Sequence, residues 1–188
     1  MRLCIVIATC ILCSTLSAQT ASAPPAKAPT GAIGTHPEWP KAKAADVDSI
    51  DHILGALYDV ISGPAHQPRD WGRMRSLFVP GAQLIPVRAS ATGADLVQFS
   101  IDGYIARASA VMEADGFFEN GIHNEVMQFG DMVDVFSTYE SRHTLADAAP
   151  FARGINSIQL LKDGNRYWIV NIFWDAERPD SKIPAKYQ

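Results

Sequence analysis

The chain has 188 residues, of which 47% are hydrophobic and 19% are charged, so it has room for one domain with one sizeable core. Its formal net charge is −4, from 16 basic and 20 acidic side chains, which argues against nucleic acid or an anionic membrane as a partner. No segment of about 20 to 50 residues is repeated, which argues against a solenoid or a propeller.

The first 18 residues have the pattern of a secretory signal peptide. A positive charge at Arg2 precedes an apolar run over residues 3–16, and small residues follow. We expect cleavage after Ala18 or as late as Ala23, and a periplasmic or secreted protein with no lasting membrane anchor. A retained anchor is the alternative interpretation.

All three cysteines, Cys4, Cys10 and Cys13, lie in this segment. The mature chain therefore has no disulfide, no thiol nucleophile and no thiolate metal site. The five histidines do not show metal-binding spacing, and the chain has no nucleophile elbow, phosphate loop or dinucleotide fingerprint. We predict neither a metal nor a cofactor.

Residues 19–45 are rich in Ala and Pro and predict a disordered linker. A domain should follow over residues 46–179, with a C-terminal tail at residues 180–188. Helical spacing of apolar residues predicts one helix near residues 50–61, with Asp46 or Asp48 as its N-cap.

A second, short helix should start at Asp70 and a third should run over residues 101–115 with Ser100 as its cap. Two short strands are expected between them, at residues 82–88 and 94–100. The remainder predicts four long strands, paired by turns at residues 129–131 and 163–165. Helices first and antiparallel strands last indicate the α+β class.

One of these strands has an unusual face. Successive strand residues point to opposite sides, so one face begins apolar and becomes polar along its length. That face consists of Val133, Val135, Ser137, Tyr139, Ser141 and His143. A face that only packed against a core would stay apolar, so its polar end is a candidate for a pocket wall.

The order of elements resembles the nuclear-transport-factor-2-like (SnoaL-like) superfamily. The segments "FGDMVDVFSTYESR", "PFARGINSIQLLKDG" and "RYWIVNIFWDAERP" are similar to those of bacterial secreted members, and the resemblance covers roughly residues 46–179. It implies a cone-shaped fold, with N-terminal helices packed in a strongly curved antiparallel sheet and a pocket at the open end. The fold hosts enzymes, ligand binders and interaction modules, so it does not specify an activity.

A two-residue turn at Gly130-Asp131 would pair Asn124 with Ser137, and Ile122 with Tyr139. In the last hairpin a three-residue loop would place Asn156 on the same concave face as Trp168, Val170, Ile172 and Trp174, whereas a loop of two or four residues would expose the opposite set. The resulting candidate ligand-binding residues are Trp71, Tyr104, Asn124, Ser137, Tyr139, Asn156 and Trp174. Each also has a structural interpretation, because buried tyrosines and aromatics often belong to the core.

No catalytic residue is evident in this register. The carboxylates of the first two long strands, Glu119, Glu125, Asp134 and Glu140, would all point away from the pocket. Asp175 and Glu177 could reach its rim, but they also fit a plain exit from the sheet. An acidic residue inside the pocket with a raised pKa would favour an enzyme over a binder.

We therefore predict a secreted protein that binds a small apolar or amphipathic molecule. The enzyme alternative is an isomerase, cyclase or hydratase-type lyase that uses the same pocket, and the third alternative is an interaction module with a filled cone. A homodimer is expected because Phe136 lies on the outward, otherwise polar, face of its strand.

Overall fold

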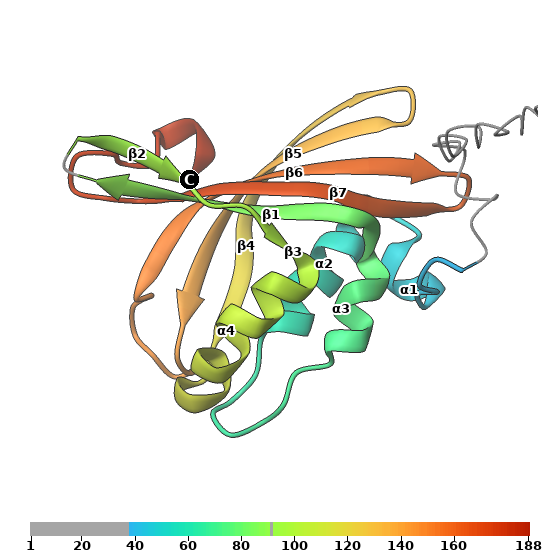
Figure 1. Cartoon of the computed structure of the whole chain (residues 1–188). Coiled ribbons are helices and arrows are strands. Elements are labelled where there is room, and N and C mark those ends of the chain that lie inside the picture. Colours follow the sequence, from blue (N-terminus) through green and yellow to red (C-terminus); the bar gives the residue numbers. More distant parts are fainter. Residues whose placement is uncertain (1–37, 91) are drawn as a thin grey trace, which may run out of the picture. The chain divides into compact units, whose positions relative to one another are not determined.

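The computed structural model describes residues 38–90 and 92–188 (Figure 1). The predicted signal peptide and most of the predicted linker lie outside the described residues. Within them, no helix has both the length and the apolar character needed to cross a membrane. The elements in chain order are α1 (Ala44–Val47), α2 (Ile50–Ile61), α3 (Trp71–Leu77), β1 (Phe78–Ser90), β2 (Gly93–Leu96), β3 (Phe99–Ser100), α4 (Ile101–Asp115), β4 (Phe118–Phe129), β5 (Met132–Arg142), β6 (Ala152–Asp163), β7 (Arg166–Ala176) and the 3-10 helix η2 (Ala185–Tyr187).

The three longer helices start where the sequence places a capping side chain. Asp70 and Ser100 accept backbone N–H groups at the starts of α3 and α4, as predicted. For α2 the predicted caps Asp46 and Asp48 are wrong, and Ser49 is the N-cap. The reason is that Asp46 belongs to the separate short helix α1 and Asp48 is its C-cap, so α2 begins at Ile50.

The strands form one sheet in the order β2-β1-β7-β6-β5-β4, and β3 pairs with β1. All neighbouring pairs are antiparallel except β1 and β7, which run parallel. The predicted antiparallel sheet is therefore observed, except at this one pair. A hairpin would have forced antiparallel pairing, but β1 and β7 are separated in the chain by α4 and five strands.

Helices α2, α3 and α4 lie on the same side of the sheet (Figure 1). Helix α2 buries Ile53 and Leu57 against that side, and the predicted core residues Val133 and Val135 of β5 are 0% and 1% exposed. The α+β cone fold expected from the sequence is the observed one.

The register of β4 against β5 changes at Ile122. Between Asn124 and the turn at Gly130, the strand pairs keep the register that a two-residue turn sets. Asn124 pairs with Ser137, as predicted. Beyond it Gly121, and not Ile122, lies opposite Tyr139, because Ile122 is an extra residue on β4. The predicted pairing of Ile122 with Tyr139 is therefore wrong.

The start of β4 is held by the end of α2, independently of that turn. The Ser62 hydroxyl accepts the Glu119 backbone N–H at 2.9 Å and donates to the Tyr58 carbonyl at 2.6 Å. Two backbone hydrogen bonds also join Gly63 to Phe117. The register that α2 imposes on the start of β4 differs by one residue from the register that the turn imposes. The bulge at Ile122 accommodates this extra residue.

A second bulge sets the inner face of β7. The last hairpin has a two-residue turn, since Asp163 pairs with Arg166, and that turn alone would put Trp174 on the outer face. An extra residue at Val170 reverses the alternation, so Trp174 lies opposite Asn156 on the inner face, as predicted for a three-residue loop. Val170 itself is 38% exposed and does not join that face.

The chain on either side of the predicted domain also packs against it. The Trp39 ring lies edge-on to Trp168, with centroids 5.7 Å apart, so folded structure begins before the predicted boundary. At the other end Tyr187 packs on Phe136, with centroids 4.9 Å apart. Phe136 therefore has an apolar contact within its own chain, and the homodimer stays a prediction.

Candidate functional site

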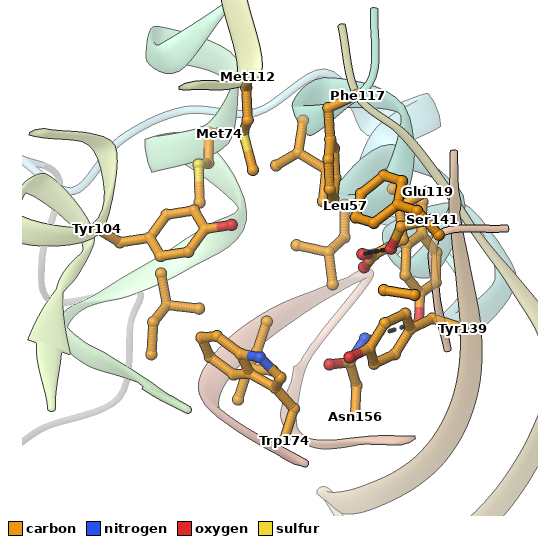
Figure 2. A pocket seen from close by; sticks show the side chains of 16 residues that line it. Leu57, Met74, Tyr104, Met112, Phe117, Glu119, Tyr139, Ser141, Asn156 and Trp174 are labelled. Atoms are coloured by element: carbon orange, nitrogen blue, oxygen red, sulfur yellow. Dashed lines mark hydrogen bonds between the residues drawn. The ribbon is translucent and has the colours of Figure 1, made fainter. Parts of the chain in front are cut away.

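A cavity of about 260 Å³ lies between α2, α3 and α4 and the inner face of the sheet (Figure 2). Its wall is mostly apolar and aromatic, with a few polar groups among them. The lining residues are Leu57, Tyr58, Ile61, Met74, Leu84, Tyr104, Met112, Phe117, Glu119, Tyr139, Ser141, Phe151, Ala152, Asn156, Ile172 and Trp174. Such a mixture is typical of a site for a small organic molecule, and the volume suits a small one.

Glu119 is the acidic residue of this wall. The bulge at Ile122 places it opposite Ser141, on the inner face of the sheet, so the prediction that Glu119 points outward is wrong. The Ser141 hydroxyl donates to Glu119 Oε2 at 2.7 Å. Figure 2 shows the carboxyl group directed into the cavity.

The surroundings of Glu119 favour its protonated form. Burial among apolar and aromatic groups raises the pKa of the Glu119 carboxyl to about 7, and hydrogen bonding from Ser141 and Asn156 only partly opposes that shift. No Lys, Arg or His lines the cavity to hold the carboxylate in its charged form. At neutral pH this group therefore exists in both protonation states.

A fully bonded polar cluster supports the wall next to Glu119. Asn156 Nδ2 donates to the Tyr58 hydroxyl at 3.2 Å, and that hydroxyl is 2.6 Å from Ser137 Oγ. Between the two hydroxyls either Tyr58 or Ser137 can be the donor, so the Tyr58 hydroxyl links Asn156 to Ser137 in both cases. Desolvation raises the pKa of Tyr58 to about 12, so it stays a neutral hydrogen-bonding group.

Tyr139 lies between two glycines, because Gly121 and Gly154 are its partners on the neighbouring strands. A Cβ atom on Gly154 would come within 2.5 Å of the Tyr139 hydroxyl and 2.4 Å of the Asp175 carbonyl oxygen. The missing side chain thus lets the Tyr139 ring lie across β6. Among the described residues the Tyr139 hydroxyl has no hydrogen-bond partner, and burial raises its pKa.

Tyr104 of α4 reaches the cavity from the wall opposite Glu119 and Tyr139 (Figure 2). Its ring lies edge-on to Trp174, with centroids 6.3 Å apart. Burial raises the pKa of Tyr104, and the described part of the chain offers its hydroxyl no hydrogen-bond partner. The cavity therefore has unpartnered phenol groups on two facing walls.

The seven candidate ligand-binding residues divide into two groups. Tyr104, Tyr139, Asn156 and Trp174 line the cavity, and Trp71, Asn124 and Ser137 do not. Trp71 packs against the core, Ser137 lies behind the wall bonded to Tyr58, and Asn124 borders a separate hollow between α2 and β4. Whether any of them binds a ligand stays a prediction.

The sequence interpretation did not find Glu119 or Tyr58. Tyr58 lies on the apolar stripe of α2 and gives no separate signal. For Glu119 the signal was Gly121, since an isolated glycine within a strand pattern indicates a bulge. Allowing for that bulge would have turned Glu119 inward.

The other carboxylates considered for the rim are engaged elsewhere. Asp175 pairs with Arg178, and Glu177 pairs with Arg153 at 3.5 Å, so neither lines the cavity. No group of three or more potential metal-binding side chains occurs among the residues that the structure describes. At the rim the His143 ring stacks on Phe151, with centroids 4.2 Å apart.

Comparison with known proteins identifies the fold. No protein-family model and no curated protein sequence matches the chain. A Nostoc punctiforme protein described as having a cystatin-like fold is 8% identical, with a TM-score of 0.52 over 69% of this chain and 90% of that chain. A Caulobacter vibrioides protein with the same fold description is 11% identical, with a TM-score of 0.51 over 71% and 90%.

A protein from Silicibacter pomeroyi described as NTF-2 like is 15% identical, with a TM-score of 0.47 over 68% of this chain and 92% of that chain. The cystatin-like fold is the same fold as the nuclear-transport-factor-2-like fold, so the predicted fold is confirmed. At these identities the likeness shows the fold alone, and the function has to be argued from the cavity.

The two tyrosines of the wall should respond differently to loss of the hydroxyl. Tyr58→Phe is expected to lower the free energy of unfolding by roughly 1 to 3 kcal/mol, because it leaves buried Ser137 and Asn156 without their shared partner. Tyr139→Phe should change it by less than about 0.5 kcal/mol, because no protein group is left unpaired. Urea unfolding of both variants tests this, and an equal loss in both would show that the Tyr139 hydroxyl is structural.

Glu119 should make the stability of the protein depend on pH. Its pKa in the folded state, about 7, exceeds the ordinary 4.5, so the folded state retains a proton that the unfolded state releases between those values. The resulting stabilisation is complete below pH 4.5 and is lost as the pH rises through 7, by roughly 3 kcal/mol at most. Glu119→Gln should remove this dependence. Parallel stability profiles of the two proteins between pH 5 and 8.5 would contradict the assignment.

Proposed function

We propose that the protein is a proton-transfer enzyme of the isomerase or lyase type, which acts on a small, mostly apolar molecule in this cavity. The observation that carries the proposal is the carboxyl of Glu119, directed into an apolar cavity with its pKa raised to about 7. A general base works best when its pKa is near the operating pH, and a solvated carboxylate is too weak a base for that role.

Glu119 would take a proton from the substrate and return it at another position. Ser141 donates to one carboxyl oxygen, Oε2, and so would orient the carboxyl toward the substrate. Removal of a proton next to a carbonyl places negative charge on the carbonyl oxygen, and hydrogen-bond donors aimed at that oxygen lower the barrier. Tyr139 lies on the same wall and supplies such a donor, because its hydroxyl has no partner among the described residues and its raised pKa keeps it protonated.

Tyr58 and Asn156 would support this chemistry without touching the reacting atoms. Their hydrogen bonds to each other and to Ser137 fix the wall from which Glu119 and Tyr139 project. A binding protein without chemistry would use the same apolar wall, but it would gain nothing from a carboxyl that has no cationic partner there and whose burial costs free energy.

The place of action and the assembly are part of the proposal. The Arg2 start and apolar run of residues 3–16 support export, so we place the protein in the periplasm or outside the cell. The same cavity would operate in each subunit of a homodimer, for which the exposed Phe173 on the outer sheet face offers apolar contact area.

Deuterium exchange into simple ketones tests the proposed chemistry. Cyclohexanone and acetophenone are incubated in D₂O with the purified protein, and deuterium at the carbon next to the carbonyl is followed by NMR. We expect exchange above the buffer rate, which increases as Glu119 ionises around pH 7. Glu119→Gln should lower the rate by roughly 100-fold or more.

Glu125→Gln is the matched control, because Glu125 is an exposed carboxylate of the same strand, paired with His123 at 3.3 Å. It should keep the wild-type rate. Exchange at the buffer rate with the wild-type protein, or equal rates in the wild-type protein and Glu119→Gln, would reject proton transfer and leave a binding protein.

A further inference from the structure

We infer that the cavity selects an uncharged molecule with a hydrogen-bond acceptor at each of two opposite ends and an apolar ring between them. The inference rests on the cavity of the proposed function and names its substrate class. It follows from three features of the wall: the charges it has, the two places where it offers donors, and the apolar surface between those places.

The first feature is the charge of the wall. Among its 16 residues Glu119 is the acid, and none is Lys, Arg or His. A ligand carboxylate or phosphate would be desolvated there next to Glu119 and would find no positive partner. The cavity therefore disfavours anions and admits uncharged molecules.

The second feature is the pair of free phenol groups. Tyr139 projects from the sheet and Tyr104 from α4, on facing walls of the cavity (Figure 2). Neither hydroxyl has a hydrogen-bond partner in the described part of the chain; the Tyr139 side chain is buried and that of Tyr104 is partly buried. Each hydroxyl is open to the cavity and has no partner among the described residues, so a ligand that supplies an acceptor to each of them gains two hydrogen bonds.

The two hydroxyls cannot both be satisfied by one end of a small ligand. Tyr104 lies near Met74 and across the cavity from Glu119, whereas Tyr139 lies beside Asn156 (Figure 2). A ligand whose first acceptor meets Tyr139 therefore needs a second acceptor at its far end to meet Tyr104. Tyr104 then positions the far end of the ligand, and Glu119 carries out the proposed proton transfer at the other end.

The third feature is the surface between the two phenols. Trp174 spans this part of the wall and contacts the Tyr104 ring edge-on, and Leu57 and Ile172 complete the apolar lining. Flat apolar walls and a volume of about 260 Å³ suit a single ring rather than an extended chain. The inferred class is thus a small cyclic dione, hydroxyketone or similar compound.

Three ring compounds that differ at one end test this inference: cyclohexanone, cyclohexane-1,4-dione and 4-oxocyclohexane-1-carboxylate. Their dissociation constants are measured by calorimetry at pH 6, where Glu119 is mostly protonated, for the wild-type protein and for Tyr104→Phe, Tyr139→Phe and Tyr167→Phe. Tyr167 is the matched control, because it does not line the cavity.

We expect the dione to bind roughly three- to tenfold more tightly than cyclohexanone, because it makes one more hydrogen bond. Tyr104→Phe and Tyr139→Phe should each reduce the dione to the affinity of cyclohexanone. The affinity for cyclohexanone should fall by less than about twofold in either variant, since its single carbonyl can turn to the remaining phenol. The carboxylate should bind most weakly, and Tyr167→Phe should change nothing.

Equal affinities of the dione and cyclohexanone, equal losses for both ketones in Tyr104→Phe, tight binding of the carboxylate, or no binding of any compound at millimolar concentration would each overturn the inference. The test needs no turnover and is therefore separate from the proposed chemistry. Glu119→Gln should abolish deuterium exchange and keep the preference for the dione, whereas failure of exchange alone would leave that preference intact.

Discussion

The extra residue at Ile122 determines which side of the sheet carries Glu119, and the character of the cavity depends on it. Strand residues alternate between faces, so one inserted residue reverses the alternation for the rest of the strand. The reversal arises because β4 is held at two points, by Ser62 at the end of α2 and by the tight turn at Gly130. Without it the inner face opposite Ser141 would present Asn120, and the cavity would have no acid.

The inward carboxyl of Glu119 has a raised pKa because its site is apolar and no cationic side chain lines the cavity. A buried carboxylate is normally stabilised by a cation, and in this domain the buried guanidinium of Arg69 is instead bonded to backbone carbonyls, including those of Ile61, Gly63 and Met112. Ser141 provides Glu119 with a hydrogen bond but no charge. The protein therefore accepts a destabilised ionised state at the site, as is common where function requires a perturbed pKa.

Much of the architecture was predictable because its signals are local. The caps at Asp70 and Ser100, the helical stripes and the turn at Gly130 each depend on a few neighbouring residues. The register beyond Ile122 was not predictable from the turn, because it also depends on the contact of Glu119 with Ser62, 57 residues away. The same limit applies to β7. Its inner face was expected to result from a longer loop, but it results from a two-residue turn combined with the bulge at Val170. Tyr104 and Tyr139 line the cavity as expected because their faces do not depend on the start of β4, whereas Trp174 does so because the bulge at Val170 compensates for the shorter turn.

The most direct test of the account is the ionisation of Glu119 itself. Carbon-13 NMR of protein labelled at the glutamate carboxyl carbon follows each glutamate through a pH titration, and the resonance missing from Glu119→Gln identifies this residue. A carboxyl in the apolar cavity, held inward by the bulge at Ile122, should titrate near pH 7. A Glu119 resonance that titrates near the ordinary 4.5 would contradict the account, because it would place the carboxyl in water on the outer face of the sheet.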